Sequence, residues 1–332
     1  MDAAAAAALL EVAEDARARA RRQDPLANRQ VEDRYPELLE AIDWHLAVGQ
    51  RDAAYRLASA LVPFWIASAR IDDGDTWFER ALGTGDASAR ALYDHGYLVF
   101  FAGRYEVAEQ RFRSALALAE TAGDRSLQAL ALAGSARVAL STDVDAAVRL
   151  LRQALAVTEG RPDSDPGRSS TLHVLGVALQ MSGDLEGARE AMSARLAMGR
   201  TSGDEFVVWT ESANLSMVER RLGNLERAEQ LSLEALQVSA SRGEEMMIAW
   251  TVNGLAAVTA AAGDHERAAT LLGAAAEMLR RAGGQWPPDE REQHDASLAE
   301  VAAALGPDAL AAALARGAGL SLTDGVAYAL RR

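Results

Sequence analysis

SMVERRLGNLERAEQLSLEAL, residues 216–236, carries the pattern that decides the fold of this chain. In it, a small residue lies seven positions before Gly223, and an alanine lies five positions after it. The same arrangement recurs around turn positions that are 39, 41, 40 and 40 residues apart, namely Gly103, Thr142, Gly183, Gly223 and Gly263. A recurrence at such a period is typical of repeat proteins, in which similar units stack on one another.

The repeated residue types predict two antiparallel helices in each unit. The turn residue ends the first helix, where glycine readily takes the left-handed conformation that a helix end often needs. Small residues before the turn and alanines after it are expected to face each other, which keeps the helix axes about 8–10 Å apart. Because one helix pair is too small to bury its apolar stripe, neighbouring pairs must stack. The small residues are Gly96, Ser135, Gly176, Ser216 and Ala256, and the alanines are Ala108, Ala147, Ala188, Ala228 and Ala268.

The composition excludes several chemistries. Among 332 residues there is no cysteine, and all 34 basic residues are arginine. This excludes a cysteine nucleophile, a cysteine-bound metal, a disulfide, a lysine Schiff base and the lysine-dependent phosphate loop. The pair His265 and Glu266 lacks the second histidine of a zinc-binding helix, because Ala269 occupies that position. We therefore expect no metal and no cofactor.

The charge and hydropathy of the chain restrict its partners. A formal net charge of −14 repels phosphate backbones, so no direct nucleic-acid partner is expected. No apolar stretch approaches the roughly 18–20 residues that a membrane helix needs. The start, residues 1–22, has no basic residue ahead of its alanine run and predicts a helix rather than a signal peptide. We expect a cytoplasmic protein without a membrane partner.

The repeated pattern is similar to the tetratricopeptide repeat over roughly residues 87–282. The resemblance implies an all-α fold, a right-handed α-solenoid of helix pairs, with units lengthened from the usual 34 residues to about 40. Five repeats (87–282) would then lie between an N-terminal helical segment (1–86) and a C-terminal helical cap (283–332), forming one continuous solenoid.

The flanking segments resemble a particular set of bacterial regulators. The positions that carry this resemblance are Leu38, Leu39, Ala41, Ile42, Trp44, Phe64, Trp65, Trp77, Phe78, Ala81 and Leu82 before the repeats, and Pro288, Glu290 and Arg291 after them. Gly325 and Val326 stand where the closing helix of that family usually has Ala-Val. The family comprises large ATPase-type, antibiotic-regulatory or LuxR-like transcription activators with a C-terminal repeat sensor. The resemblance implies a sensor, either excised from such a regulator or free-standing.

The resemblance also places the first helix of each pair on the concave face of the solenoid. Residues 13, 10, 6, 3 and 2 positions before each turn are then predicted to line a groove. Aromatic residues at one end, alanines along the floor and a few polar groups are typical of a small-molecule pocket. The candidate ligand-binding residues are Arg90, Tyr93, Tyr97, Phe100, Phe101, Leu132, His173, Gln180, Met217, Arg220, Trp250 and Asn253.

Three functions remain open from the sequence. The first is a regulatory binding or sensor protein whose groove takes a small apolar or aromatic molecule, or a peptide or protein segment. The second is a cofactor-free enzyme that uses the groove as a reaction chamber for a cyclisation or rearrangement, although no catalytic residue is assigned. The third is an adaptor for protein assembly. A homodimer is a further alternative, and His95 is interpreted as packed between helices.

Overall fold

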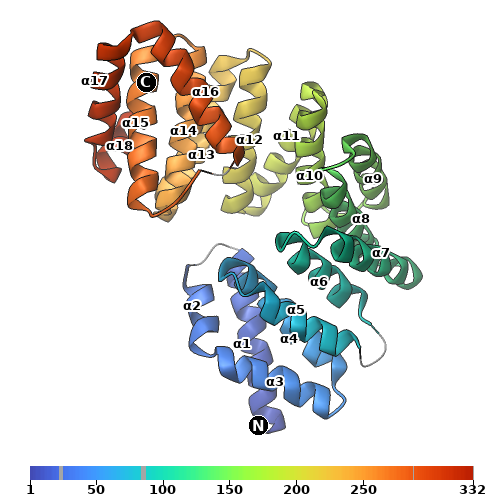
Figure 1. Ribbon diagram of the computed structural model, residues 1–332. Coiled ribbons are helices and arrows are strands. Elements are labelled where there is room, and N and C mark those ends of the chain that lie inside the picture. The colour runs from blue at the N-terminus through green and yellow to red at the C-terminus, as the bar shows by residue number, and fades with distance from the viewer. Residues whose placement is uncertain (22–24, 84–86, 287, 332) are drawn as a thin grey trace. The chain divides into compact units, whose positions relative to one another are not determined.

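The computed structural model describes residues 1–21, 25–83, 87–286 and 288–331, and every regular element in these ranges is an α-helix (Figure 1). The predicted all-α fold of stacked helix pairs is confirmed, whereas its right hand and 40-residue period stay predictions. The helices form two compact units, Met1–Ser182 and Gly183–Arg332. The division falls inside the predicted repeat array, and the predicted boundaries at 86/87 and 282/283 remain sequence-based expectations.

The first unit contains ten helices in its described part (blue to green in Figure 1). Helix α4 is central to its first half, because it packs against α1, α3, α5 and α6. From α6 onward, each helix packs against the next, and α8 also contacts α6 and α10. The bounds are α1 (Ala3–Arg21), α2 (Pro25–Asp33), α3 (Tyr35–Ala47), α4 (Arg51–Ala67), α5 (Ile71–Leu82), α6 (Ala89–Phe101), α7 (Tyr105–Ala122), α8 (Arg125–Ala139), α9 (Val144–Val157) and α10 (Pro166–Ser182).

Large aromatic side chains in the core of the first unit pack against glycines on neighbouring helices. Phe112 of α7 is fully buried, and a Cβ atom added to Gly134 of α8 would lie 2.6 Å from its ring. A Cβ at Gly96 of α6 would lie 2.9 Å from the same ring. Gly96, which marks the repeat, and Gly134, which precedes the marker Ser135, therefore make room for the ring between neighbouring helices, as close packing requires.

The second unit consists of four consecutive helix pairings followed by a C-terminal group of helices (yellow to red in Figure 1). Helices α11 to α15 pack successively, and α15 then packs against both α16 and α17. Helix α16 also contacts α14. The bounds are α11 (Leu185–Ser202), α12 (Glu205–Arg221), α13 (Leu225–Arg242), α14 (Glu245–Ala261), α15 (His265–Arg281), α16 (Pro288–Leu305), α17 (Pro307–Ala318) and α18 (Leu322–Leu330).

The predicted turns are visible in the backbone. Gly263 has φ +87°, a left-handed conformation that costs a residue with a Cβ more than it costs glycine. Asp264 follows at once and accepts a hydrogen bond from the backbone N–H of Arg267, which caps α15. The same glycine–aspartate step ends one helix and starts the next at 123–124, 183–184 and 203–204. Gly183 is one of the predicted turn positions, whereas the steps at 123–124 and 203–204 lie between successive helix pairs.

Two contacts in the second unit explain repeat positions. The Ser216 hydroxyl donates to the backbone carbonyl of Ala228 at 2.9 Å, so the small residue and the alanine face each other as predicted. Arg195 replaces the alanine found twelve residues after the other turns, and its guanidinium pairs with the fully buried carboxylate of Glu211. The exception in the pattern is therefore an ion pair that joins α11 to α12.

None of the described helices combines the length and the apolar character that crossing a membrane requires.

Candidate functional site

The first unit has a cavity of about 420 Å³ on the side of α4, α6, α8 and α10. Its volume lies in the range of pockets that bind small molecules. Four of the predicted ligand-binding residues line it: Arg90, Tyr93, Tyr97 and Phe101. The other lining residues are Arg17, Val62, Pro63, Ile66, Ala67, Asp94, Leu130, Arg137, Pro166 and Ser170.

Aromatic rings from α6 form one wall of this cavity. Successive turns of the helix stack the Tyr93 and Tyr97 rings at 6.2 Å between centroids, with an angle of 21°. The Phe101 ring meets Tyr97 edge-on at 5.2 Å. Burial raises the pKa of Tyr93 to about 12, so its hydroxyl stays protonated and can donate a hydrogen bond at neutral pH. The wall therefore combines apolar rings with the neutral phenol of Tyr93.

A buried carboxylate holds two arginines at the edge of the cavity. Asp94 is 2 % exposed, and it accepts hydrogen bonds from Arg90 at 2.7 and 2.9 Å and from Arg17 at 3.1 and 3.3 Å. Burial by itself raises the pKa of Asp94, but the two guanidinium groups outweigh it and hold the pKa below its ordinary value. Asp94 is therefore ionised at neutral pH, and the pair of arginines keeps one positive charge in excess.

Arg17 also satisfies a backbone group that a proline leaves open. Pro63 lies inside α4 and has no N–H, so the carbonyl of Ser59 lacks its partner four residues along the helix. The Arg17 guanidinium donates to that carbonyl oxygen at 2.6 Å. The proline in α4 therefore fixes the position of an arginine on α1 beside the cavity.

Arg137 of α8 is the third arginine of the cavity. Its guanidinium carbon lies 5.9 Å from the centre of the Tyr97 ring, within reach of a cation–π contact. Within the described ranges it makes no ion pair with a carboxylate. Among the three arginines that line the cavity, Arg137 is the one without a carboxylate partner in the described part of the chain.

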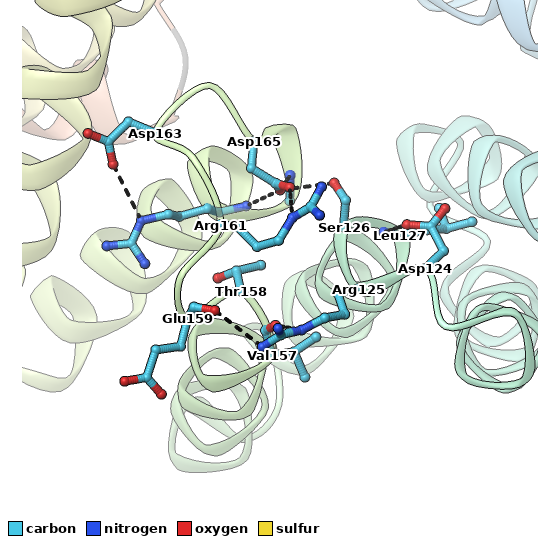
Figure 2. A network of polar contacts seen from close by, with 12 residues as sticks. Asp124, Arg125, Ser126, Leu127, Val157, Thr158, Glu159, Arg161, Asp163 and Asp165 are labelled. Atoms are coloured by element: carbon cyan, nitrogen blue, oxygen red, sulfur yellow. Dashed lines mark hydrogen bonds and ion pairs between the residues drawn. The ribbon is translucent and has the colours of Figure 1, made fainter.

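The polar network in Figure 2 holds the start of α10, which brings Pro166 and Ser170 to the cavity. Asp165 is 2 % exposed and accepts from Arg161 at 2.9 Å, from the Ser126 hydroxyl at 2.9 Å and from two backbone N–H groups of α10. Burial alone raises the pKa of Asp165, but these donors lower it below the ordinary value. The carboxylate therefore caps α10 and ties it to α8.

The second unit has a separate cavity of about 80 Å³, lined by the predicted residues Met217 and Trp250. Asn253, predicted to face an open groove, is fully buried instead. Its amide nitrogen donates to the Glu290 carboxylate at 3.0 Å, and its Oδ1 accepts from Nδ1 of the His294 ring at 2.9 Å; both partners are on α16. Helix α16 therefore covers the position that the sequence assigned to a ligand.

The remaining predicted residues line neither cavity. Leu132 is 2 % exposed and packs with Ala129 and Ala154 in the core, which corrects its placement on an open face. Its side chain packs toward α9, where Ala154 lies. Phe100 contacts Phe101 and Tyr105 outside the cavity. His173, Gln180 and Arg220 are half-buried elsewhere.

A histidine and two carboxylates meet between α5 and α6. Ligand atoms of Asp75, Glu79 and His95 lie within 4.8 Å of one another in the described part of the chain. Arg104 pairs with Asp75, and Arg111 pairs with Glu79, so guanidinium groups already balance both carboxylates. His95 is fully buried and stacks on Phe78 at 5.1 Å, as its interpretation as a packed residue predicted. The cluster is thus an ion-pair network around a core histidine.

His95 is expected to make the first unit less stable in mild acid. Burial lowers the pKa of His95, and the hydrogen bond with Asp75 opposes this only in part. The unfolded chain therefore takes up a proton near pH 6.5, before the folded chain does, and stability falls as pH decreases below that value. The hydrogen-exchange protection factors of residues 89–101, which are corrected for the pH dependence of the intrinsic exchange rate, should fall as the pH decreases from about 6.5 to 5. His95→Gln should flatten this dependence, whereas His265→Gln in the second unit should leave it unchanged; equal slopes in all three proteins would contradict the assignment.

Comparison with known proteins addresses the fold. A family model described as Tetratricopeptide repeat matches residues 206–281, which span α12 to α15. No curated protein is similar enough to the chain to be counted as a relative. Among solved structures, a Signal Transduction ATPase with Numerous Domains protein with a tetratricopeptide repeat sensor, from Pyrococcus horikoshii, is 16 % identical with a TM-score of 0.60. The match covers 88 % of this chain and 47 % of that one.

Two further structures are similar over nearly the whole chain. The apo form of RapI is 14 % identical with a TM-score of 0.58, covering 94 % of this chain and 85 % of that one. A Rap protein complexed with Competence and Sporulation Factor is 13 % identical with a TM-score of 0.55, covering 98 % and 99 %. At these identities the likeness concerns the fold alone. The family model therefore supports tetratricopeptide repeats within residues 206–281, and the solved structures show that the chain shares their fold.

Proposed function

We propose that the cavity of the first unit binds an amphipathic anion, in which a carboxylate is joined to an apolar or aromatic body, and that this binding is regulatory. The observation that carries the proposal is Arg137, a guanidinium beside the aromatic wall of α6 that has no carboxylate partner among the described residues. Three arginines and a single aspartate line this cavity, although the whole chain carries a net charge of −14. A cationic cavity in an acidic protein selects anions.

The chemistry of the lining favours a carboxylate on a flat apolar body. A planar guanidinium binds a carboxylate through two parallel N–H donors. The stacked rings of Tyr93 and Tyr97, with Val62 and Ile66 from α4, provide apolar surface for the rest of the ligand. Either a small aromatic acid or the C-terminal carboxylate of a peptide has this chemistry.

Similarity to regulatory proteins supports the sensor role within this proposal. The flanking motifs resemble those of ATPase-type transcription activators, and one structural neighbour carries a tetratricopeptide repeat sensor in an ATPase. Another neighbour is described as a quorum sensor, NprR from B. thuringiensis, at 13 % identity and a TM-score of 0.54. We therefore propose that the chain senses its ligand as part of a regulatory system, with a partner module that reads the bound state.

Binding of 2-naphthoate tests this proposal, with neutral 2-naphthamide as the matched probe. Arg137→Gln should raise the Kd of 2-naphthoate about tenfold or more, because a hydrogen-bonded charge contributes about 1.5–3 kcal/mol. The Kd of 2-naphthamide should change little. Tyr97→Ala should weaken both probes, because both stack on the wall. Isothermal titration calorimetry measures the Kd of both probes for the wild type and for each of the two variants.

Arg152→Gln is the control, since Arg152 is exposed on α9 of the same unit. It should leave both probes unaffected. Equal binding of naphthoate by the wild type and Arg137→Gln would disprove the proposed role of Arg137. The dipeptide Ala-Phe and its C-terminal amide test whether the cavity takes the carboxylate of a peptide. If the dipeptide binds more tightly than both its amide and 2-naphthoate, the ligand is assigned to the C-terminal ends of peptides.

A further inference from the structure

The cavity of the second unit differs from the cavity of the first unit in the chemistry of its lining residues and in the way it is closed. It lies among α12, α13 and α14, and residues Glu290 and Gln293 of α16 close it. We infer that this cavity is a second binding site, specific for a small planar amide or lactam that packs against Trp209 and Trp250. The inference is independent of the function proposed for the first unit, because every lining residue belongs to the second.

Gln293 is the main observation behind this site. Its side chain is 8 % exposed, and neither its amide oxygen nor its amide nitrogen has a hydrogen-bond partner among the described residues. Leaving a buried amide unsatisfied is costly, and such groups are rare in folded proteins. A core position would tolerate leucine or methionine without this cost. A polar partner in the cavity explains why glutamine is there.

The position of Gln293 is fixed by contacts of its neighbours on α16. The amide nitrogen of Asn253 on α14 donates to the Glu290 carboxylate at 3.0 Å, and the amide oxygen of Asn253 accepts from His294 Nδ1 at 2.9 Å. The His294 ring also stacks on Trp286 at 5.0 Å between centroids. These contacts hold α16 against α14 on both sides of Gln293. The amide is therefore presented to the cavity by a fixed segment of helix.

The walls of the cavity suit a flat molecule. The rings of Trp209 and Trp250 lie 6.5 Å apart at 29°, and both residues line the cavity together with Met217. The Trp209 indole N–H donates to the Thr251 hydroxyl at 2.9 Å. The buried indole N–H of Trp250, in contrast, has no acceptor among the described residues. The site thus offers aromatic faces, a spare donor from Trp250, and both a donor and an acceptor from Gln293.

Size and charge narrow the class of ligand. A volume of about 80 Å³ holds a few waters or one small group, and is below that of a pocket for a drug-sized molecule. The Glu290 carboxylate also lines the cavity and disfavours an anion. A planar amide or lactam matches an unpaired carboxamide, because each has one N–H donor beside one C=O acceptor and the two can form a cyclic pair of hydrogen bonds.

Titration with 2-pyrrolidone, a small lactam, tests the site in the full-length protein. The readout is the set of indole N–H resonances in ¹⁵N-labelled protein, assigned by single Trp→Phe variants. We expect the Trp209 and Trp250 resonances to shift and saturate in the millimolar range, while Trp44, Trp65 and Trp77 in the first unit stay unchanged. N-methyl-2-pyrrolidone lacks the N–H, and cyclopentanone lacks the whole amide; both should bind at least tenfold more weakly.

Gln293→Met separates hydrogen bonding from shape, since methionine has a similar length and no amide. It should abolish the 2-pyrrolidone shift and raise the thermal midpoint of the free protein, because the unsatisfied amide is removed. Gln293→Glu keeps the shape but loses the N–H donor, and it should weaken lactam binding if the methionine variant fails to fold. The control is Gln237→Met, which changes an exposed glutamine of α13 and should alter neither property.

Three results would overturn the inference. Unchanged 2-pyrrolidone binding in a folded Gln293 variant would show that this amide does not contact the ligand. Equal affinity for 2-pyrrolidone and cyclopentanone would show an apolar cavity without amide recognition. The absence of any shift with all three probes would show that the cavity holds water only.

Discussion

Replacing Asp94 by alanine is expected to lower the free energy of unfolding of the first unit by about 3 kcal/mol. The carboxylate is buried between Arg17 and Arg90, and its removal leaves two guanidinium groups facing each other without a counter-charge. The cost of losing the counter-charge is expected to be larger for Arg17, because its side chain is only 17 % exposed, whereas that of Arg90 is 37 % exposed and partly solvated. Urea denaturation and hydrogen exchange of α1, α4 and α6 measure the loss.

The pH dependence of the same group has a definite sign. Because Arg17 and Arg90 hold the pKa of Asp94 below its ordinary value despite burial, the carboxylate contributes stability above the unfolded pKa of about 3.9. That contribution is lost as pH falls through the lower, folded pKa. In Asp94→Ala, this contribution of the carboxylate to the decrease of stability at acid pH should be absent. Glu37→Ala, which removes an exposed partner of Arg34, is the control and should cost under about 0.5 kcal/mol. A similar small cost for Asp94→Ala would contradict the assigned role.

Gly317→Ala is expected to destabilise the C-terminal helices by about 2–3 kcal/mol, although alanine is the better helix former. Gly317 of α17 lies directly against the backbone of α15, where an added methyl group would overlap the Thr270 carbonyl oxygen. The contact is reciprocal, because a methyl group at Gly273 of α15 would overlap the Leu314 carbonyl oxygen of α17. A backbone atom cannot turn aside as a side chain can, so the two helices must separate.

Gly319→Ala provides the matched control two residues away. A Cβ there would meet the carbonyl oxygens of Ala315 at 3.4 Å and Arg316 at 3.5 Å, both in ordinary van der Waals contact. This variant should be neutral or slightly stabilising, by about 0.5 kcal/mol, because alanine loses less backbone entropy than glycine on folding. Hydrogen exchange in α15 and α17 compares the two proteins. Faster exchange in both variants, or in neither, would show that close contact at Gly317 does not hold α17 in place.

Much of the fold could be predicted from local sequence. Gly223 and Gly263 predicted turns, and both have positive φ in the structure. Ser216 and Ala228 predicted a close approach, and a hydrogen bond joins them. These predictions succeed because turn conformation and helix packing distance depend on residues that lie within a few turns of each other in the sequence.

The candidate sites were predicted only in part. The resemblance to the repeat family, together with offsets counted from the turn, predicted that Tyr93, Tyr97 and Phe101 line the groove, and all three line the cavity of the first unit. Arg17 was missed, because it is 77 residues from its partner Asp94 and belongs to a helix outside the repeats. Arg137 was missed because its offset from Thr142 was not among those assigned to the groove. Pro63 inside α4 could have indicated a partner such as Arg17, because a proline leaves the carbonyl four residues before it, here that of Ser59, without an N–H donor from the helix.

By itself, the sequence determined the class of fold, the helix pairs and their turns, and the absence of cysteine and lysine chemistry. Which side chains meet was decided by the tertiary structure alone. Arg137 lies beside an aromatic wall and has no carboxylate partner among the described residues. Helix α16 covers Asn253 and places Gln293 at a second cavity. The physical reason is that helix propensity and repeat spacing act over a few residues. Charge balance and cavity shape depend instead on residues distant in sequence, and only packing of the whole unit brings these together.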